Sequence, residues 1–528
     1  MTSASSHQTT LLSAHKALAS GDFQQAHSLT MSVLQEAPST AEGYFIMALI
    51  AHRHGNVAKA EEIVKRALGF AAGHVDYLLF QAQCLLELSR HEEAKSVVAS
   101  LDQKPLTTAL QNDTLGVLHS RLGHHREALP LFRRACELNP EAVSMQYNLA
   151  SCLQFSGAFD EAETAYETAI RLDPHNYRSH SSLSQLRRHT DDDNHIERLQ
   201  ALWPTLGADA DARLHVGHAL AKEYEDLENY EQAFYWLQQA NSEKLKLLER
   251  RDEQDSALFT ALHNLAAELA ASEATGHTSE EPIFIVGMPR TGTTLIERIL
   301  SSHTDVESAG ELANFSLLVK RQLQTTSQWV LDVETIAQAG KLDFQKLGGD
   351  YLESTRHLTG TSPHFIDKMP LNFMYVPMIA RALPNARIIC LRRNPMDTCL
   401  SNYRQLFSTN FSYYNYAYSL RDTAQFYAQF QSLMDHLGEL LGDRFLQISY
   451  EAVVDDPEAE TRRLLAHCGL PWQEQCLQFH SNTAPVATAS SVQVREKIYR
   501  RAVDRWRHYE PWLSDAKDVF DTHGIVYE

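Results

Sequence analysis

Small apolar residues recur among polar ones with a fixed period over the first 180 residues. One stands every 34 positions, at Ala26, Ala60, Ala94, Ala128 and Ala162. Another small residue precedes each of these by twelve positions, at Ala14, Ala48, Ala82, Gly116 and Ala150. Because small side chains let two helices approach closely, this spacing predicts five helix–turn–helix units in strict register.

Glycine and proline punctuate the same units. Turns are predicted at Gly21, Gly55, Gly123 and Gly157, and three units close at Pro38, Pro140 and Pro174. A 34-residue unit with this order of positions resembles the tetratricopeptide repeat. The resemblance implies a superhelix of paired helices whose concave groove receives a peptide or another protein. The alternative is that the array only stabilises or oligomerises the chain.

The register breaks in the polar run LRRHTDDDNH, which predicts a loop. The segment ENYEQAFYWLQQAN, with Ala233, is typical of one more repeat displaced by three residues, and the helical pattern ends in the polar linker ASEATGHTSEE. We therefore expect three parts: repeats over 1–186, a helical region with a further repeat-like unit and a linker over 187–280, and a third domain over 281–528.

The third domain opens on an apolar run, Ile283 to Val286, which is long enough for a buried parallel strand. It leads into the glycine loop GMPRTGTT and then the helical LIERILSSH. This order predicts a phosphate cradle, since free N–H groups at the start of a helix attract anions. It is not a Walker A loop, because Thr293 stands where that motif has lysine.

The loop instead resembles the 5′-phosphosulfate loop of sulfotransferases that use 3′-phosphoadenosine 5′-phosphosulfate (PAPS). The resemblance implies an α/β, P-loop-like domain with a parallel sheet, PAPS as the co-substrate and no metal. The matching residues, which would bind the 5′-phosphate, are Arg290, Thr291, Gly292, Thr293 and Thr294.

A second strand, Ile388 to Leu391, precedes the segment RRNPMDTCLS. In the same superfamily an Arg and a Ser eight residues apart hold the 3′-phosphate, and Arg393 and Ser401 match them. By the same resemblance Tyr450, predicted to end a strand, would contact adenine. Further nucleotide contacts would come from a closing basic tract, at Ser490, Tyr499 and Arg505; the alternative is a solvated helix face with surface ion pairs.

Two residues match the acid–base pair of tyrosylprotein sulfotransferases. Glu311, in ESAGEL, would accept the proton of the acceptor hydroxyl, and Lys368, in FIDKMPLNF, would stabilise the leaving oxygen. His303 is a rival base for which a structural role is favoured. The aromatic stretch 406–430 is either an acceptor lid or part of the core, and the sequence leaves both open.

Net charge, cysteine spacing and apolar segments indicate which partners and which compartment to expect. A net charge of −20 argues against nucleic acid as a partner. The seven cysteines are scattered and without a C-x-x-C pair, and no signal segment or 18-residue apolar span is apparent, so we expect reduced thiols, no membrane span and a cytoplasmic location. The oligomeric state stays open, with a dimer among the alternatives.

The combined motifs predict sulfuryl transfer from PAPS to an acceptor hydroxyl, favouring a peptide or protein tyrosine presented with help from the repeat groove. One alternative is a small-molecule, glycan or lipid hydroxyl as acceptor. Another, of a different class, is a repeat scaffold whose nucleotide domain does not catalyse. A nucleoside-triphosphatase is disfavoured by Thr293.

Overall fold

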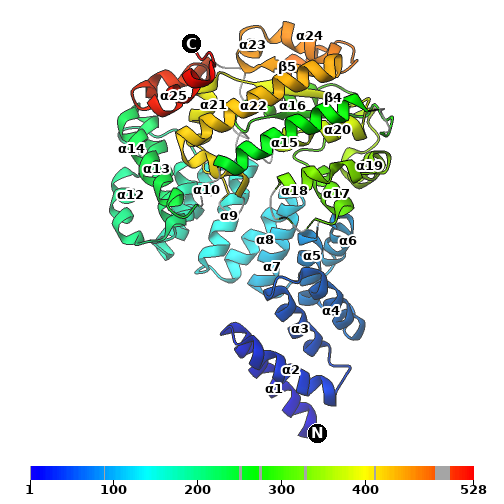
Figure 1. The fold of residues 1–528 in the computed structure, drawn as a ribbon. Helices are drawn as coiled ribbons and strands as arrows, with labels where there is room; N and C mark the ends of the chain where they lie inside the picture. The colour runs from blue at the N-terminus through cyan, green and yellow to red at the C-terminus, as the bar shows by residue number, and fades with distance from the viewer. Residues whose placement is uncertain are drawn as a thin grey trace. The chain divides into compact units, whose positions relative to one another are not determined.

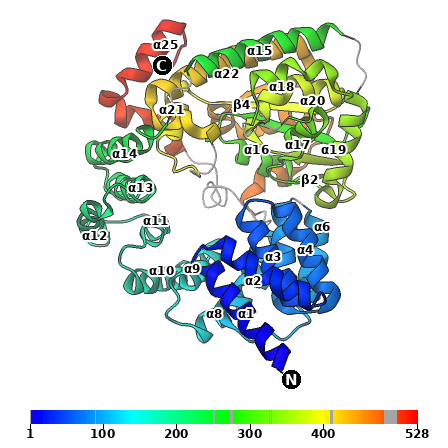
Figure 2. The same cartoon turned by 60° about the horizontal axis from the view of Figure 1, so that its bottom comes forward.

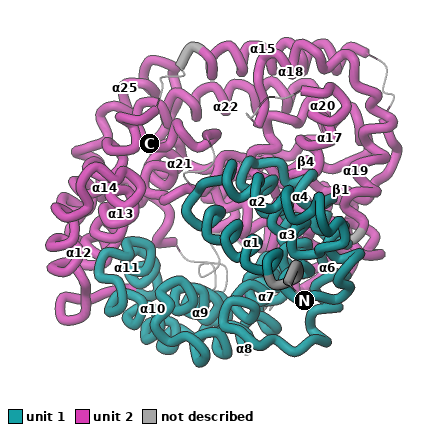
Figure 3. Tube along the Cα trace, turned by 90° about the horizontal axis from the view of Figure 1, so that it is seen from below, with its two compact units in different colours: residues 1–187 teal, residues 188–528 magenta. Residues whose placement is uncertain are grey.

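The computed structural model describes residues 2–88, 90–248, 252–272, 276–325, 327, 330–408, 412–481 and 500–528. The chain divides into two compact units, residues 1–187 and 188–528 (Figure 3). Residues 188–280 thus share a compact unit with the sheet that follows them. The division at residue 280 into a separate part remains a prediction.

Unit 1 is built of helices that pack in consecutive pairs and can be followed from the N-terminus in Figure 2. They are α1 (Thr2–Ala19), α2 (Phe23–Glu36), α3 (Ala41–Arg53), α4 (Val57–Phe70), α5 (Val75–Glu87), α6 (His91–Leu101), α7 (Ala109–Arg121), α8 (His125–Leu138), α9 (Val143–Ser156), α10 (Phe159–Leu172) and α11 (Tyr177–Ser184). This confirms the predicted tetratricopeptide repeats.

The periodic small residues hold each pair together. The five alanines that repeat every 34 positions, from Ala26 to Ala162, are fully buried. A Cβ atom on Gly116 would lie 2.8 Å from a ring carbon of Phe132, so any larger side chain would push these two helices apart. The turn glycines, such as Gly157, adopt positive φ angles that other residues rarely take.

Unit 2 begins with helices and one short 3₁₀ turn: α12 (Ile196–Leu202), η1 (Trp203–Leu206), α13 (Ala210–Asp226), α14 (Tyr230–Leu245) and α15 (Asp252–Ala271). Helices α13 and α14 form the predicted repeat-like pair, with Ala233 fully buried between them. Helix α15 lies beside α22 (Leu420–Leu441) in both Figures 1 and 2. Within the helical region, α15 therefore packs directly against helices of the part that contains the sheet.

The sheet of unit 2 has five parallel strands in the order β2–β3–β1–β4–β5. They are β1 (Pro282–Gly287), β2 (Val306–Ser308), β3 (His364–Asp367), β4 (Arg387–Arg392) and β5 (Phe445–Ser449). Every residue of β1 is buried, as expected of a central strand covered on both faces. The predicted α/β domain with a parallel sheet is confirmed.

Helices and 3₁₀ turns connect and cover these strands (Figure 1). Besides α22 they are α16 (Thr293–Leu300), α17 (Asn314–Leu323), α18 (Val333–Ala337), η2 (Ala339–Lys341), α19 (Phe344–Thr359), η3 (Pro370–Tyr375), α20 (Val376–Ala382), α21 (Pro395–Tyr403), η4 (Ser412–Tyr418), η5 (Gly442–Arg444), α23 (Tyr450–Asp455), α24 (Pro457–His467), η6 (Glu474–Ser481), η8 (Arg500–Ala502), η9 (Arg505–Trp512) and α25 (Ser514–His523). Among the described helices, none combines the length and apolarity that crossing a bilayer requires.

The carboxyl ends of parallel strands meet at one edge of a sheet, where α/β proteins bind ligands. In this sheet β1 lies between β3 and β4, so the segments that follow these three strands are neighbours. Those segments carry Arg290, Lys368 and Arg393, while β2 and β5 lead to Glu311 and Tyr450. One edge of the sheet thus gathers candidates from all five strands.

Candidate functional site

The loop between β1 and α16 has the geometry of an anion cradle. Arg290 and Gly292 both have positive φ angles, of 68° and 102°, which turn the chain sharply into the helix. Among the residues that the structure describes, no side chain caps the start of α16, so the first N–H groups of the helix have no side-chain acceptor there. Thr293 and Thr294 form its first turn. The hydroxyl of Thr291 forms a hydrogen bond within the loop, donating to the carbonyl oxygen of Met288 at 2.8 Å.

Tyr450 closes one side of this loop. It follows β5 directly as the first residue of α23, one position beyond the end of the strand, which sequence reasoning placed at Tyr450 itself. A Cβ atom on Gly292 would lie 2.6 Å from the ring of Tyr450, which explains why glycine is needed there. The guanidinium carbon of Arg393 lies 5.1 Å from the centre of the same ring. The segments after β1, β4 and β5 therefore meet at Tyr450.

Arg393 and Ser401 are brought together as their spacing predicts. Arg393 Nη1 donates to Ser401 Oγ at 3.1 Å and to the carbonyl oxygen of Arg290 at 3.2 Å. Its Nη2 bonds the carbonyl oxygen of Ala502 and lies 3.5 Å from the carboxylate of Asp397. Within the described residues, the buried Nε atom has no hydrogen-bond partner. An N–H group left in this state suits an incoming anion such as a phosphate.

The described part of the closing basic tract is fixed beside this pair. Asp397 accepts hydrogen bonds of 2.9 Å from the backbone N–H groups of Asp504 and Trp506. Burial raises the pKa of Asp397. These bonds attach η9 to α21, the helix that carries Ser401.

Arg505 does not join Arg393 and Ser401. Its guanidinium forms an ion pair with the buried Glu225 of α13, which Arg404 also contacts. Other described arginines of the tract likewise form ion pairs, Arg500 with Asp455 and Arg507 with Asp504. Ser490 and Tyr499 lie outside the described residues, so their predicted nucleotide contacts remain predictions.

Glu311 and Lys368 are in direct contact. Lys368 Nζ donates to Glu311 Oε1 at 2.5 Å, and the Lys368 backbone N–H donates to the carbonyl oxygen of Gly310 at 2.8 Å. Lys368 is 1% exposed, whereas 40% of the Glu311 side chain is exposed. The lysine is thus held within the protein while the carboxylate keeps an open side.

Two buried carboxylates that sequence reasoning missed lie beside Lys368: Glu297 is close to it in space, and Asp367 precedes it in the chain. Glu297 of α16 lies 3.8 Å from Lys368 Nζ and accepts a 2.5 Å hydrogen bond from Ser308. Asp367, the last residue of β3, accepts hydrogen bonds from Tyr351 at 2.8 Å and Asn372 at 3.2 Å. Burial raises the pKa of Asp367 to about 7. A carboxylate directly after the apolar pair Phe365–Ile366 at the end of a strand was the available signal for Asp367; Glu297 had none.

Asp367→Asn is expected to change how the free energy of unfolding depends on pH. The raised pKa means that the native protein keeps a proton on Asp367 up to pH about 7, whereas the unfolded chain releases it near 3.8. Between these values the native state binds more protons, so wild-type stability falls as pH rises. As pH rises through this window, the free energy of unfolding of the variant should increase relative to that of wild type by on the order of 2–4 kcal/mol. Denaturant unfolding at several pH values measures it; the exposed Asp443→Asn is the control, and parallel curves for Asp367→Asn and wild type would contradict the expectation.

Both ring nitrogens of His303, the rival base, form hydrogen bonds. Its Nε2 donates to the carbonyl oxygen of Pro471 at 3.0 Å, and its Nδ1 accepts from the N–H of Asp305 at 3.1 Å. The residue is 2% exposed. This is the geometry of a structural histidine.

The described part of the aromatic stretch contributes mainly to the core. Tyr416 is buried, stacks on Phe426 with 4.1 Å between ring centres, and donates to Asn402 at 3.1 Å. Tyr413 differs, because its side chain is only half-buried. Burial and the Glu311 carboxylate together raise the pKa of its phenol. From Tyr416 onward the stretch thus supplies core residues, whereas its edge, Ser412 to Asn415, is half-buried.

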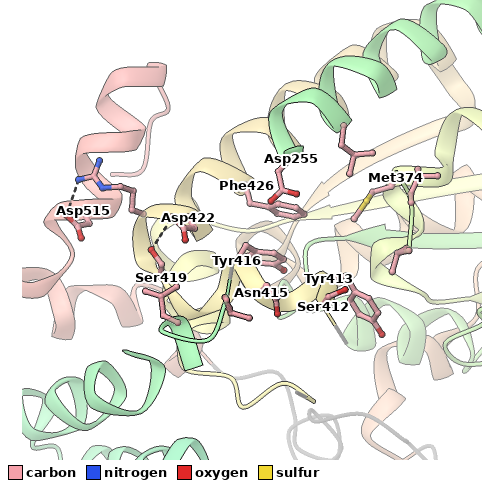
Figure 4. A pocket seen from close by; sticks show the side chains of 16 residues that line it. Asp255, Met374, Ser412, Tyr413, Asn415, Tyr416, Ser419, Asp422, Phe426 and Asp515 are labelled. Atoms are coloured by element: carbon pink, nitrogen blue, oxygen red, sulfur yellow. Dashed lines mark hydrogen bonds and ion pairs between the residues drawn. The ribbon is translucent and has the colours of Figure 1, made fainter. Parts of the chain in front are cut away.

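That edge borders a cavity of about 430 Å³ (Figure 4). Tyr413, Tyr416 and Phe426 supply aromatic walls, and further apolar walls come from α15, η3 and neighbouring segments, at Leu245, Leu248, Leu258, Val330, Leu331 and Met374. Its charged lining residues are Asp255, Arg421, Asp422 and Asp515. The volume falls within the range of ligand pockets, and the lining is net acidic.

Comparisons with known proteins find matches in both halves of the chain. Residues 282–474 match the sulfotransferase family, and residues 11–75 and 114–177 match the tetratricopeptide repeat. An uncharacterized protein of Aquifex aeolicus is 30% identical over 74% of this chain and 52% of its own length. A protein-tyrosine sulfotransferase of Drosophila melanogaster is 24% identical over 42% of this chain and 46% of its own length. The chain spans about half the length of these two relatives.

Among solved structures, the sulfotransferase domain of the Synechococcus PCC 7002 olefin synthase aligns with a TM-score of 0.35 at 20% identity, covering 48% of this chain and 99% of that domain.

Proposed function

The chain carries a sulfotransferase-family domain behind tetratricopeptide repeats, and from this premise we propose that it transfers a sulfuryl group from PAPS to the hydroxyl of a peptide or protein tyrosine. The observation that carries the proposal is the contact of Lys368 with Glu311 at the sheet edge where the loop after β1 and Arg393 also lie. An acid–base pair beside two anion-binding segments is what this transfer requires.

The nucleotide would be held at two points. The first N–H groups of α16, with Arg290, Thr293 and Thr294, suit the 5′-phosphate, because a helix N-terminus carries partial positive charge. Arg393 suits the 3′-phosphate, since its Nε is buried without a partner among the described residues. Tyr450, against Gly292 and Arg393, offers a ring face beside both points.

The proposed transfer step divides the chemistry between Glu311 and Lys368. Glu311 accepts the proton of the acceptor hydroxyl, whose oxygen forms the new S–O bond. Lys368 stabilises the negative charge on the phosphate oxygen as its bond to sulfur breaks. Glu297, 3.8 Å from Lys368 Nζ, helps to hold the lysine side chain in place. A carboxylate base with an open side suits a phenol, which is more acidic than an alkyl hydroxyl.

Three observations support a tyrosine acceptor. Relatives that match this chain are named protein-tyrosine sulfotransferases. The cavity beside Tyr413 has aromatic walls that suit a phenol ring. Burial and, after it, the Glu311 carboxylate raise the pKa of Tyr413. The repeats, as in their family, suit binding of a protein partner or acceptor. Because the cavity is net acidic, we expect tyrosines flanked by basic or neutral residues to be preferred over those flanked by acidic ones.

Arg393→Ala should weaken binding of 3′-phosphoadenosine 5′-phosphate, the nucleotide product, roughly 10- to 100-fold, because hydrogen bonds to charged groups contribute about 1.5–3 kcal/mol. Calorimetric titration without metal measures this. Arg392→Ala is the matched control, since Arg392 pairs instead with Asp435 and Gln447. Equal loss in both variants, or preference of the wild type for ATP with Mg²⁺, would contradict the nucleotide assignment.

The proposed activity itself is tested with PAPS carrying a labelled sulfuryl group. Tyrosine peptides with basic, neutral or acidic flanks are offered beside small phenols, a glycan and a lipid hydroxyl. Label in peptides supports the proposal, and label only in the other acceptors would replace tyrosine as the substrate. Nucleotide binding without transfer to any acceptor would favour the scaffold alternative.

A further inference from the structure

Two histidines and a glutamate converge near the start of unit 2, outside the residues assigned to sulfuryl transfer. His189 and His195 lie in the polar loop before and at the start of α12, and Glu223 lies on α13. One ligand atom from each residue falls within 4.8 Å of the other two. Glu223 Oε1 is 2.9 Å from His195 Nδ1 and 3.7 Å from His189 Nε2.

The cluster is enclosed by the protein. The side chains of Glu223 and His189 are 0% and 2% exposed, and that of His195 is 14% exposed. The two imidazole rings meet edge to face, with centres 4.9 Å apart. Burying a carboxylate is costly unless a positive charge or strong hydrogen bonds compensate it.

Backbone groups orient two of the three side chains, those of His189 and Glu223. His189 Nδ1 donates to the carbonyl oxygen of Asp193 at 3.2 Å, so in the neutral imidazole Nε2 is the nitrogen that carries a lone pair. This Nε2 is the atom facing Glu223. Glu223 Oε2 accepts the N–H of His195 at 2.6 Å, which leaves Oε1 directed at both rings. Metal-binding histidines are typically held in this way by a carbonyl group on their second nitrogen.

The donor set indicates the class of ion. Two imidazole nitrogens and one carboxylate oxygen suit zinc and its neighbours among the divalent transition metals, whereas Ca²⁺ and Mg²⁺ prefer oxygen ligands. At metal–ligand distances of about 2.0–2.1 Å, tetrahedral ligands are separated by roughly 3.3 Å. The observed separations of Glu223 Oε1 from the two histidine nitrogens, 2.9 Å and 3.7 Å, lie on either side of that value. The neighbouring Lys222 is engaged with Asp226 at 2.6 Å.

We propose that His189, His195 and Glu223 form a structural binding site for a divalent transition-metal ion of the zinc class, with water completing the coordination. The ion fixes the polar loop 188–195 to α13. Because α13 also carries Glu225, the ion-pair partner of Arg404 and Arg505, the site stabilises the helix on which the C-terminal segment is held.

The test is metal binding by the full-length protein after dialysis against a chelator. Wild type is titrated with Zn²⁺ in competition with a chromogenic chelator, which excludes weak surface sites, and then with Co²⁺ as a spectroscopic probe. We expect one tight equivalent of Zn²⁺, a higher melting temperature with the metal, and the visible absorption of tetrahedral Co²⁺. His189→Ala should weaken binding by more than the roughly 10- to 100-fold that loss of a supporting residue costs.

Glu223→Gln keeps the size of the side chain and an acceptor for the His195 N–H, so it answers the question even if His189→Ala fails to fold. The exposed His175→Ala is the control and should retain the tight equivalent. No tight equivalent in wild type would overturn the proposal, leaving a hydrogen-bonded cluster without metal. Equal Zn²⁺ affinity in Glu223→Gln and wild type would overturn it as well.

Discussion

Glu311→Gln is expected to lower the rate constant for sulfuryl transfer about 10²- to 10⁴-fold, the range that a positioned general base contributes. Glutamine has nearly the same shape and keeps an oxygen that accepts the Lys368 hydrogen bond, but it cannot take up the proton of the acceptor. The fold and the nucleotide site should therefore persist. Transfer of labelled sulfuryl groups under single-turnover conditions measures the chemical step without interference from product release.

Two control measurements show whether the lower rate reflects loss of the base at Glu311. Affinity for 3′-phosphoadenosine 5′-phosphate should be within about twofold of wild type, because a loss of nucleotide binding would lower the rate for a different reason. Glu307→Gln, an exposed carboxylate on β2 four residues earlier, should keep full activity. If Glu311→Gln transfers sulfuryl groups at the wild-type rate, another group is the base and the assignment of Glu311 is wrong.

Local sequence patterns predicted those elements whose geometry depends on residues that are close together in the sequence. The repeats follow from a period of 34 residues, because each helix pair needs small residues at fixed positions, and Gly116 against Phe132 shows that need directly. The loop at Gly292 and the Arg393–Ser401 contact follow from short spacings after a strand, since the direction of the strand determines where the next few residues point.

Contacts made across the fold could not be predicted in the same way. Arg505 matched a family position by its place in the sequence, yet its guanidinium pairs with Glu225, 280 residues earlier on α13. Glu297 lies one turn into α16 and resembles any helical glutamate until Lys368 is placed beside it. Such ion pairs depend on how helices cover the sheet, which neither hydrophobic periodicity nor motif spacing encodes.

Lys368→Met should impair both transfer and folding. Loss of the cation that stabilises the leaving oxygen should lower the rate about 10²- to 10³-fold, as loss of one such group does in other enzymes. The same change leaves the Glu297 carboxylate, whose side chain is only 10% exposed, without its positive neighbour. Breaking a buried ion pair in this way costs about 3–5 kcal/mol of the free energy of unfolding. Denaturant unfolding and single-turnover transfer measure the two effects separately.

The two effects can be separated by one further substitution. In Lys368→Met/Glu297→Gln the buried charge is gone, so most of the lost stability should return, whereas transfer should stay as slow as in Lys368→Met. Glu311 needs no such compensation, because 40% of its side chain is exposed to water. Recovery of transfer together with stability in the double variant would mean that Lys368 only supports the fold. Recovery of stability alone would assign its charge to the leaving oxygen.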